Sequence, residues 1–521
     1  MKRYNKITGV LAVATLSLFS ACSEDAMDRI NKDNDHTTSV AARFILADVI
    51  TSTAFSNSSG DLNTYASAYV EYEVGVDNQL FYAETRESEP SSSSTYNNVW
   101  NGIYSTLKNA RIIVKQCGEG GRDHGNYLTQ GMGEVMAAYN CALLTDFFGD
   151  APCSQAALVD EYGSPVYLTP KMDTQQEIYT QIMAYLNDAI VNLQKSDLAD
   201  VSGQDFLYDG DAAKWLKFAY GLKARYTMRL LSRSSNRDAD LYKVLEYVSK
   251  SFTSADEQAA FSLYDATNIN PLYGFYVARA ALGASQSLCN KLITSNDPRA
   301  GRAFFTPVAS QKRTQVAAND ATLIPAPNGT PDQSTSKYGI SAFMYAKTAP
   351  TLLLSYHELL FLKAEALVRL GDPTAKDALK AAVTAGLLNA ENSIAIAIRE
   401  LGTALNTNGS APFDKTNAEA YFDNEVEGRY NANSLQETMI QKYFALWGTS
   451  GEATETYNDI RRMKGMNENF ITLSNPLNAT KFPLRYSYGN SDTTANPEVK
   501  AAYGNGDYVY SEPVWWAGGS R

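Results

Sequence analysis

Histidine is almost absent from this sequence, with three among 521 residues. Histidine carries out much of the proton transfer in enzymes near neutral pH, and it is the commonest metal ligand. One of the three lies in "YHELL" without a second histidine four residues later, which excludes the helix motif of zinc proteases. We therefore expect no catalytic residues, no metal and no cofactor.

Positive charge is also scarce, since 45 lysines and arginines face 57 acids and give a net charge of −12. Proteins that bind nucleic acid carry a basic patch, because they must neutralise phosphates. The same acidic balance gives no attraction to an anionic membrane surface. We therefore expect no nucleic-acid partner.

Cysteine is rare and shows no metal or redox spacing. Apart from Cys22, the chain has Cys117, Cys141, Cys153 and Cys289, and no two of the five form a C-x-x-C pair. This pattern excludes the common zinc and thioredoxin-like motifs. Cys141 lies inside an apolar helical run and is predicted to be a buried free thiol. Whether the others pair is left open by the sequence.

Long hydrophobic runs are missing except near the start. The chain opens with the basic "MKRYNK", followed by the uncharged "ITGVLAVATLSLFSA". That run is shorter than the roughly 20 residues of a membrane span, and it has the features of a secretory signal. A later apolar stretch near Leu352–Leu370 is interrupted by charged side chains. We predict a signal peptide over residues 1–21.

The segment "FSACSED" that follows resembles the lipobox of bacterial lipoproteins, although Phe19 stands where leucine is usual. The resemblance implies cleavage before Cys22 and lipidation of its thiol; the alternative is an ordinary signal peptide that ends near a cysteine. Each buried CH₂ contributes about 0.8 kcal/mol, so several acyl chains on one residue anchor a protein firmly. Cleavage would remove three basic residues and no acid, and would shift the net charge from −12 to −15.

Residues 22–39 are polar and charged and are predicted to form a lipidated tether to a body spanning residues 40–521. Within the tether, Asn31, Asp33 and Asp35 match the start of a calcium loop. The sixth position of that loop requires glycine for its sharp turn, and here it is His36. A solvated tether is therefore favoured over a calcium site.

Tyrosine is abundant, with 33 residues, and its apolar ring with a polar tip suits wet binding surfaces. The body shows apolar residues three and four apart, which predicts a mostly α protein. The clearest stripes are Trp100, Ile103, Leu107, Ala110 and Val114; Tyr179, Ile182, Leu186, Ala189 and Leu193; Trp215, Phe218, Leu222, Tyr226 and Leu230; and Leu353, Tyr356, Leu360, Ala364 and Leu367.

A helical hairpin is predicted around Gly371. Gly371 would end one helix, Asp372 would cap the next, and Pro373 fits a first helical turn. Together with small residues that allow close approach, the hairpin loosely matches the tetratricopeptide pattern. Gly149 is predicted to end another helix. Long polar stretches between the helices are predicted to be irregular.

Several segments, taken in order, resemble the SusD/RagB family of nutrient-binding outer-membrane lipoproteins of Bacteroidetes. They are "YNNVWNGIYSTLKNARIIV", "LLTDFFGDAPCSQAAL", "KWLKFAYGLKARYTMRLL", "SYHELLFLKAEALVRLGD", "IQKYFALWG", "YNDIRRMKG" and "FPLRYSYG". The resemblance runs from Cys22 to the C-terminus. It departs from the family at Thr456, where an aromatic is frequent, and at "RRMKG", which replaces a more usual RRTG. It implies a right-handed superhelix of tetratricopeptide-like helix pairs with irregular ligand-facing loops.

The resemblance also implies a function. Such proteins bind an oligosaccharide, or in some branches a peptide, and deliver it to a partner TonB-dependent transporter of the SusC kind without bond chemistry. Ser23, Glu24 and Asp25 resemble the acidic export signal that follows the lipidated cysteine. They imply an outer-membrane lipoprotein that faces the cell exterior.

Two other functions are compatible with the sequence. A surface glycan-degrading enzyme would need two carboxylates, and Glu71 and Glu73 are a candidate pair. Adjacent acids in an acidic protein, however, usually face solvent. A protein-interaction scaffold is the other, since helical repeats often bind proteins. A scaffold needs no aromatic ligand site, whereas a glycan binder does.

Aromatic residues on predicted loops are the ligand-site candidates, because their rings stack on sugar C–H faces while amides and arginine bind hydroxyls. Trp100, Trp215 and Trp447 are instead expected in the core. The candidate ligand-binding residues are Phe81, Tyr82, Tyr96, Tyr273, Phe275, Tyr276 and Arg279.

Overall fold

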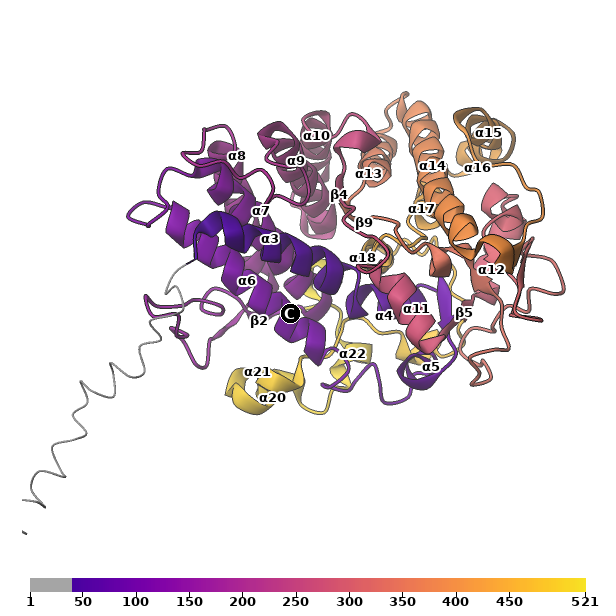
Figure 1. Cartoon of the computed structure of the whole chain (residues 1–521), viewed down its shortest axis with the longest axis horizontal. Coiled ribbons are helices and arrows are strands. Elements are labelled where there is room, and N and C mark those ends of the chain that lie inside the picture. Colours follow the sequence, from indigo (N-terminus) through magenta and orange to yellow (C-terminus); the bar gives the residue numbers. More distant parts are fainter. Residues whose placement is uncertain (1–39) are drawn as a thin grey trace, which may run out of the picture. The chain divides into compact units, whose positions relative to one another are not determined.

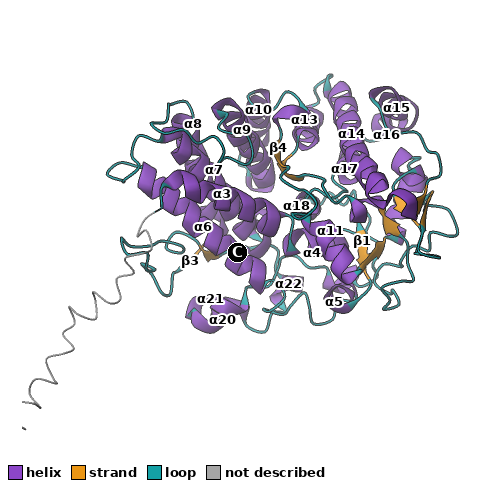
Figure 2. Ribbon diagram, viewed as in Figure 1, coloured by secondary structure: helices purple, strands orange, loops and turns teal. Residues whose placement is uncertain are grey.

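The computed structural model describes residues 40–521. The predicted signal peptide, Cys22, Ser23, Glu24, Asp25 and the calcium-like segment lie outside the described residues and stay predictions. Within the described part, Figure 2 shows a fold dominated by helices, with short strands between them.

Long helices follow one another along the chain, and most pack on the next in sequence (Figure 1). α3 packs on α6, α6 on α7, α7 on α8, and the series continues through α9, α10, α13 and α14. The helices of the first half are α3 (Ala42–Ser52), α4 (Asp61–Tyr69), α5 (Asn78–Glu84), α6 (Asn97–Cys117), α7 (Tyr127–Phe148), α8 (Gln175–Asn192), α9 (Ala212–Arg229) and α10 (Arg237–Ser249).

The second half adds a hairpin and a C-terminal set of helices. α17 packs on both α13 and α14, and α18 packs back on α4 near the start of the body. Their bounds are α11 (Pro271–Arg279), α12 (Gln286–Thr294), α13 (Tyr356–Leu370), α14 (Ala375–Leu401), α15 (Lys415–Tyr421), α16 (Glu427–Ala432), α17 (Ser434–Ala445), α18 (Ala453–Gly465), α19 (Asn478–Lys481), α20 (Asn490–Ala495), α21 (Pro497–Tyr503) and α22 (Tyr508–Ser511).

Strands are short and connect distant segments. β1 pairs antiparallel with β5, β2 with β3, and β4 with β9, while a four-stranded sheet has the order β10-β7-β6-β8. The bounds are β1 (Glu73–Gly75), β2 (Ala151–Pro152), β3 (Met172–Asp173), β4 (Ala259–Phe261), β5 (Leu282–Ala284), β6 (Phe304–Phe305), β7 (Arg313–Val316), β8 (Ile340–Ser341), β9 (Thr351–Leu354) and β10 (Leu405–Asn406).

The apolar stripes predicted for α6, α8 and α9 form much of the core. Trp100 and Trp215 are fully buried and Trp447 is nearly so, as expected for core tryptophans. Gly149 ends α7 with a positive φ of 79°, also as predicted. The mostly α fold of serial helix pairs is confirmed.

The fourth stripe was partly wrong. Leu353 belongs to β9, and Ser355 caps α13 by accepting a hydrogen bond from the Glu358 N–H at 3.0 Å. α13 is buried nearly all round, including Glu358 and Glu365. Glu358 and Glu365, two of the charged residues that interrupt the apolar run, form buried ion pairs with Arg225 and Arg462, whereas Lys363 is exposed.

The hairpin around Gly371 is confirmed, but its cap differs. Gly371 ends α13 in the left-handed region, with φ 68°. Asp372 accepts from the backbone N–H and hydroxyl of Thr374, at 2.8 and 2.6 Å, and α14 begins at Ala375. Asp372 therefore shapes the turn without capping the helix end.

Residues Ala375–Ala404 are long and apolar enough for a membrane span by length and composition, the one such helix among the described residues. Half of the apolar window is buried within the protein, where α14 packs on α13 and α17. This is the pattern of a core helix.

Candidate ligand-binding groove

A groove of about 600 Å³ lies between three segments that are far apart in sequence. They are the π-helix η1 (Thr53–Ser58) with the start of α4, the first turns of α6, and the segment from Ile269 into α11. Figure 1 shows α11 beside α4, with α6 nearby. The volume lies within the usual range for small-molecule sites.

Phe55 supplies an aromatic wall of the groove. It lies in η1, where the wider π-turn interrupts the helical chain between α3 and α4, and such turns are frequent at functional sites. The Phe55 side chain is 38% exposed, and its ring centroid lies 6.2 Å from that of Tyr264. Phe275, half-buried on α11, also lines the groove.

Asn57 forms part of the groove floor. Its Nδ2 donates to Thr106 Oγ1 at 3.0 Å and to Asn140 Oδ1 at 2.9 Å, which fixes the amide orientation. Among the described residues, its buried Oδ1 has no hydrogen-bond partner. A Cβ on Gly102 would lie 2.8 Å from that oxygen, so α6 packs closely against it and only glycine fits there.

Asp61 brings charge to the groove. It begins α4, where the positive end of the helix dipole favours a carboxylate. Burial raises the pKa of Asp61, and the positive charge of Arg279 acts in the opposite direction. Ser56, Ser59, Thr64 and Asn98 add hydroxyl and amide groups to the lining.

The predicted candidates Tyr273, Phe275, Tyr276 and Arg279 lie on α11, so the prediction that they sit on a loop was wrong. Asn270 caps this helix and Pro271 occupies its first turn, which explains why a proline-containing segment is helical. Phe275 lines the groove, and Arg279 lies close enough to act on Asp61. Tyr276 is buried and its hydroxyl accepts from Arg313 at 2.9 Å, while Tyr273 donates to Glu400 at 3.2 Å.

The other candidates lie elsewhere. Phe81 and Tyr82 are on α5, with ring centroids 5.7 Å apart, and neither lines the groove. Tyr96 is fully buried: its hydroxyl lies 2.6 Å from that of Tyr69, and its ring stacks on Tyr486 at 4.1 Å. Tyr96 therefore occupies an aromatic core position, and its role in ligand binding has no support from this geometry.

Comparison with known proteins places the chain in a family. A family model described as "Starch-binding associating with outer membrane" matches residues 33–489. The chain belongs to the SusD-like family. This confirms the resemblance seen in the sequence motifs.

Solved structures of SusD-like proteins have the same fold as this chain. A SusD/RagB family protein from Bacteroides thetaiotaomicron is 76% identical, with a TM-score of 0.90, covering 93% of this chain and 100% of that one. A chitin-binding SusD homologue from Flavobacterium johnsoniae is 18% identical, with a TM-score of 0.65, covering 91% of this chain and 98% of the other. A further chitin-binding protein is 20% identical, with a TM-score of 0.69 and coverage of 92% and 99%. No curated protein matches the chain significantly.

The carboxylate pair that a glycosidase would need does not face solvent in this SusD-like chain. Glu71 and Glu73 are both buried. Glu71 accepts from the backbone N–H groups of Ser474 and Asn475 at 2.7 and 2.6 Å. Burial raises the pKa of Glu73 to about 8, against hydrogen bonds from Ser341 and Trp447. Both carboxyls therefore hold distant segments together.

A second pocket, of about 350 Å³, lies between α12, α17 and the segment Phe470–Ser474. Lys291 lies in its wall, with its ammonium 3.7 Å from the Glu71 carboxylate. Burial lowers the pKa of Lys291, and Glu71 opposes that change. The lysine of this pocket therefore already has a buried counter-ion.

Proposed function

We propose that the mature chain is a surface lipoprotein that binds an oligosaccharide in the groove and delivers it to a SusC-like TonB-dependent transporter. Membership of a family described as starch-binding and associated with the outer membrane supports this role. So does the description of two structural relatives as chitin-binding.

The observation that carries the proposal is the composition of the groove. Phe55 and Phe275 offer aromatic surface for sugar C–H faces, and serine, threonine and asparagine side chains lie beside them. Ser56 and Asn98, both exposed at the groove, present a hydroxyl and an amide that suit ligand hydroxyls. A sugar has apolar C–H faces for the aromatic rings and hydroxyl groups for the polar side chains.

The groove is proposed to bind without cleaving. Glycoside hydrolysis generally uses two carboxyl groups on either side of the scissile bond. Asp61 is the one carboxyl side chain among the residues that line the groove, while Glu71 and Glu73 are committed to buried contacts. Delivery of an intact ligand is consistent with a transporter as the next step.

The location rests on residues outside the described part of the chain. Lipidation of Cys22 would anchor the protein, and Ser23, Glu24 and Asp25 would direct it to the outer face. A Cys22→Ala variant is expected to leave the membrane fraction without detergent and appear in the soluble fraction. Retention of that variant in membranes stripped of the transporter would contradict the anchor.

Binding is tested by calorimetry of the mature chain against starch-derived and chitin-derived oligosaccharides, other glycans and peptides, with product analysis of each mixture. We expect saturable binding of at least one glycan and its recovery intact. Binding confined to peptides would overturn the glycan assignment. New reducing ends would overturn the absence of cleavage.

A further inference from the structure

Two cysteine side chains meet in the core, outside the groove lining, and both are free thiols in this structure, as predicted for Cys141. Cys141 lies on α7, and Cys153 follows β2 directly. Their Sγ atoms are 3.5 Å apart, and both residues are fully buried. A disulfide has an S–S distance of about 2.05 Å, so the thiols need to approach by about 1.5 Å to bond.

The surrounding groups hold this pair in place. Asp173 of β3 accepts from the Cys153 N–H at 2.9 Å, and Arg111 of α6 donates to the Cys153 carbonyl oxygen at 2.8 Å. The Arg111 guanidinium also lies 3.7 Å from Cys153 Sγ. Cys153 is therefore fixed on both sides of its backbone while its sulfur faces Cys141.

The other two cysteines of the described chain are different. Cys117 and Cys289 are buried in separate parts of the core, and burial raises the pKa of Cys117 to about 12. The hydrogen bond from Cys153 lowers the pKa of Cys141, and the positive charge of Arg111 adds to this effect against the opposing effect of burial. The arrangement therefore favours a thiolate at Cys141, while the hydrogen bond to Cys141 and burial raise the pKa of Cys153.

We propose that Cys141 and Cys153 are a disulfide site, closed by thiol–disulfide exchange as the chain folds. The Cys141 thiolate attacks one sulfur of an external disulfide and releases its other sulfur as a thiolate. Cys153 then loses its proton and attacks the Cys141 sulfur, which expels the second external thiolate. Two chain thiols are oxidised, and one external disulfide is reduced to two thiols.

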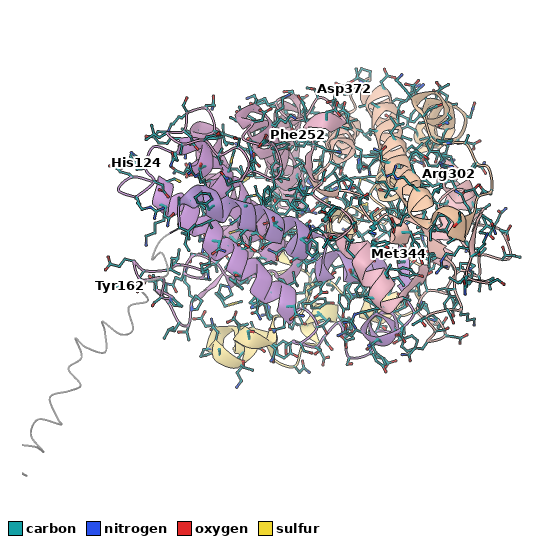
Figure 3. The ribbon with its side chains drawn as sticks, in the orientation of Figure 1. His124, Tyr162, Phe252, Arg302, Met344 and Asp372 are labelled. Carbon is teal, nitrogen blue, oxygen red and sulfur yellow. The ribbon has the colours of Figure 1, made fainter. Side chains whose placement is uncertain are left out.

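The bond would fasten a protruding loop to the central helix. The chain between β2 and β3 carries the exposed side chains of Tyr162 and Leu168 and is closed by a bridge between Val159 and Pro165. Figure 3 shows Tyr162 at the outer edge of the described structure. Cys153 lies at the base of this loop, so a bond to α7 would fix the base while the tip stays exposed.

The site rests on geometry, and its biological use rests on the proposed export to an oxidising compartment. The test needs no export: the purified chain is incubated with oxidised glutathione in sub-denaturing urea, then unfolded in an alkylating agent. Peptide mapping is expected to show a Cys141–Cys153 link, with Cys117 and Cys289 alkylated. Four alkylated thiols in the described chain, or a link to another cysteine, would overturn the site.

Two variants control the result. A Cys117→Ala/Cys289→Ala double variant retains the pair and is expected to give the same link. A Cys153→Ser variant is expected to lose the link and to leave Cys141 alkylated or joined to glutathione. A link that fails to form in the double variant would also contradict the proposal. Glycan binding is measured separately, so failure of the proposed function leaves this test unaffected.

Discussion

Arg462 of α18 and Glu365 of α13 form a buried bidentate ion pair. Arg462 Nη1 donates to Glu365 Oε1 at 2.7 Å, and Nη2 donates to Oε2 at 2.8 Å. Both side chains are almost fully buried. Arg462 also reaches Asp459 at 3.1 Å, and Asp459 pairs with Lys442 of α17 at 2.7 Å. The pair therefore joins the C-terminal "YNDIRR" motif to the helical hairpin.

Replacement of Arg462 by Met is expected to destabilise the protein by about 3–5 kcal/mol, because it leaves the buried Glu365 with one cation in place of two. Arg462→Lys keeps the charge but loses the bidentate geometry, so its loss of unfolding free energy is expected to be smaller. Chemical denaturation measures both. Lys415→Ala, which removes an exposed pair with Glu419, is the control, and a similar loss there would contradict the account.

Glu73 makes stability depend on pH. Burial raises its pKa from 4.5 to about 8, so the folded state holds a proton that the unfolded state releases. The stabilisation is complete below about pH 4.5, falls by up to about 1.4 kcal/mol per pH unit as pH rises, and is lost above about pH 8.

Glu73→Gln is therefore expected to flatten the fall in unfolding free energy between those pH values. Part of the pH dependence is expected to remain in the variant, because burial also raises the pKa of Glu84, to about 7. Denaturant titrations at several pH values measure the slope. An unchanged slope would show that Glu73 is already ionised in the folded protein at neutral pH.

Gly465 permits a close contact at the end of α18. A Cβ there would lie 2.4 Å from the carbonyl oxygen of Ala517, next to the buried Trp516. Gly465→Ala is expected to cost about 1–3 kcal/mol through the forced backbone shift. Gly428 in α16 has no neighbour within 4 Å of a new Cβ, so Gly428→Ala is expected to be neutral or up to about 1 kcal/mol stabilising. Equal losses would refute the steric argument.

Phe55 is expected to matter for binding more than for stability, since its side chain is already partly exposed. Phe55→Ala should weaken glycan affinity about tenfold or more, which corresponds to about 1.4 kcal/mol, with little change in melting temperature. Tyr242→Ala on α10, which is 63% exposed and outside the groove, is the matched control. Equal affinities of the two variants would remove Phe55 from the site.

The helices could be predicted from sequence because local periodicity encodes them. The stripes of α6, α8 and α9 bury Trp100, Ile182 and Phe218 as expected. The groove could not be predicted in the same way, because three segments separated by up to about two hundred residues assemble it. Phe275 was found from its aromatic surroundings in sequence, whereas Phe55 was missed because "TAFSNSSG" gives no sign of a π-helix.

Tyr96 shows the limit of aromatic content as a signal. In this chain many tyrosines form buried ring clusters, and Tyr96 is one of them, stacked on Tyr486. Sequence composition does not distinguish a ring that faces a ligand from one that packs on other rings. Glu365 is a similar case: it is a charged residue on a predicted helix, and the arginine that pairs with it in the core lies about a hundred residues away in the sequence.

A crystal structure of the mature chain with the tightest-binding oligosaccharide tests the central claim most directly. The account predicts an intact ligand in the groove, with sugar rings against Phe55 and Phe275 and hydroxyls within hydrogen-bond distance of Ser56 or Asn98. A ligand bound elsewhere, for instance in the pocket beside Lys291, or a ligand cleaved in the groove, would contradict it.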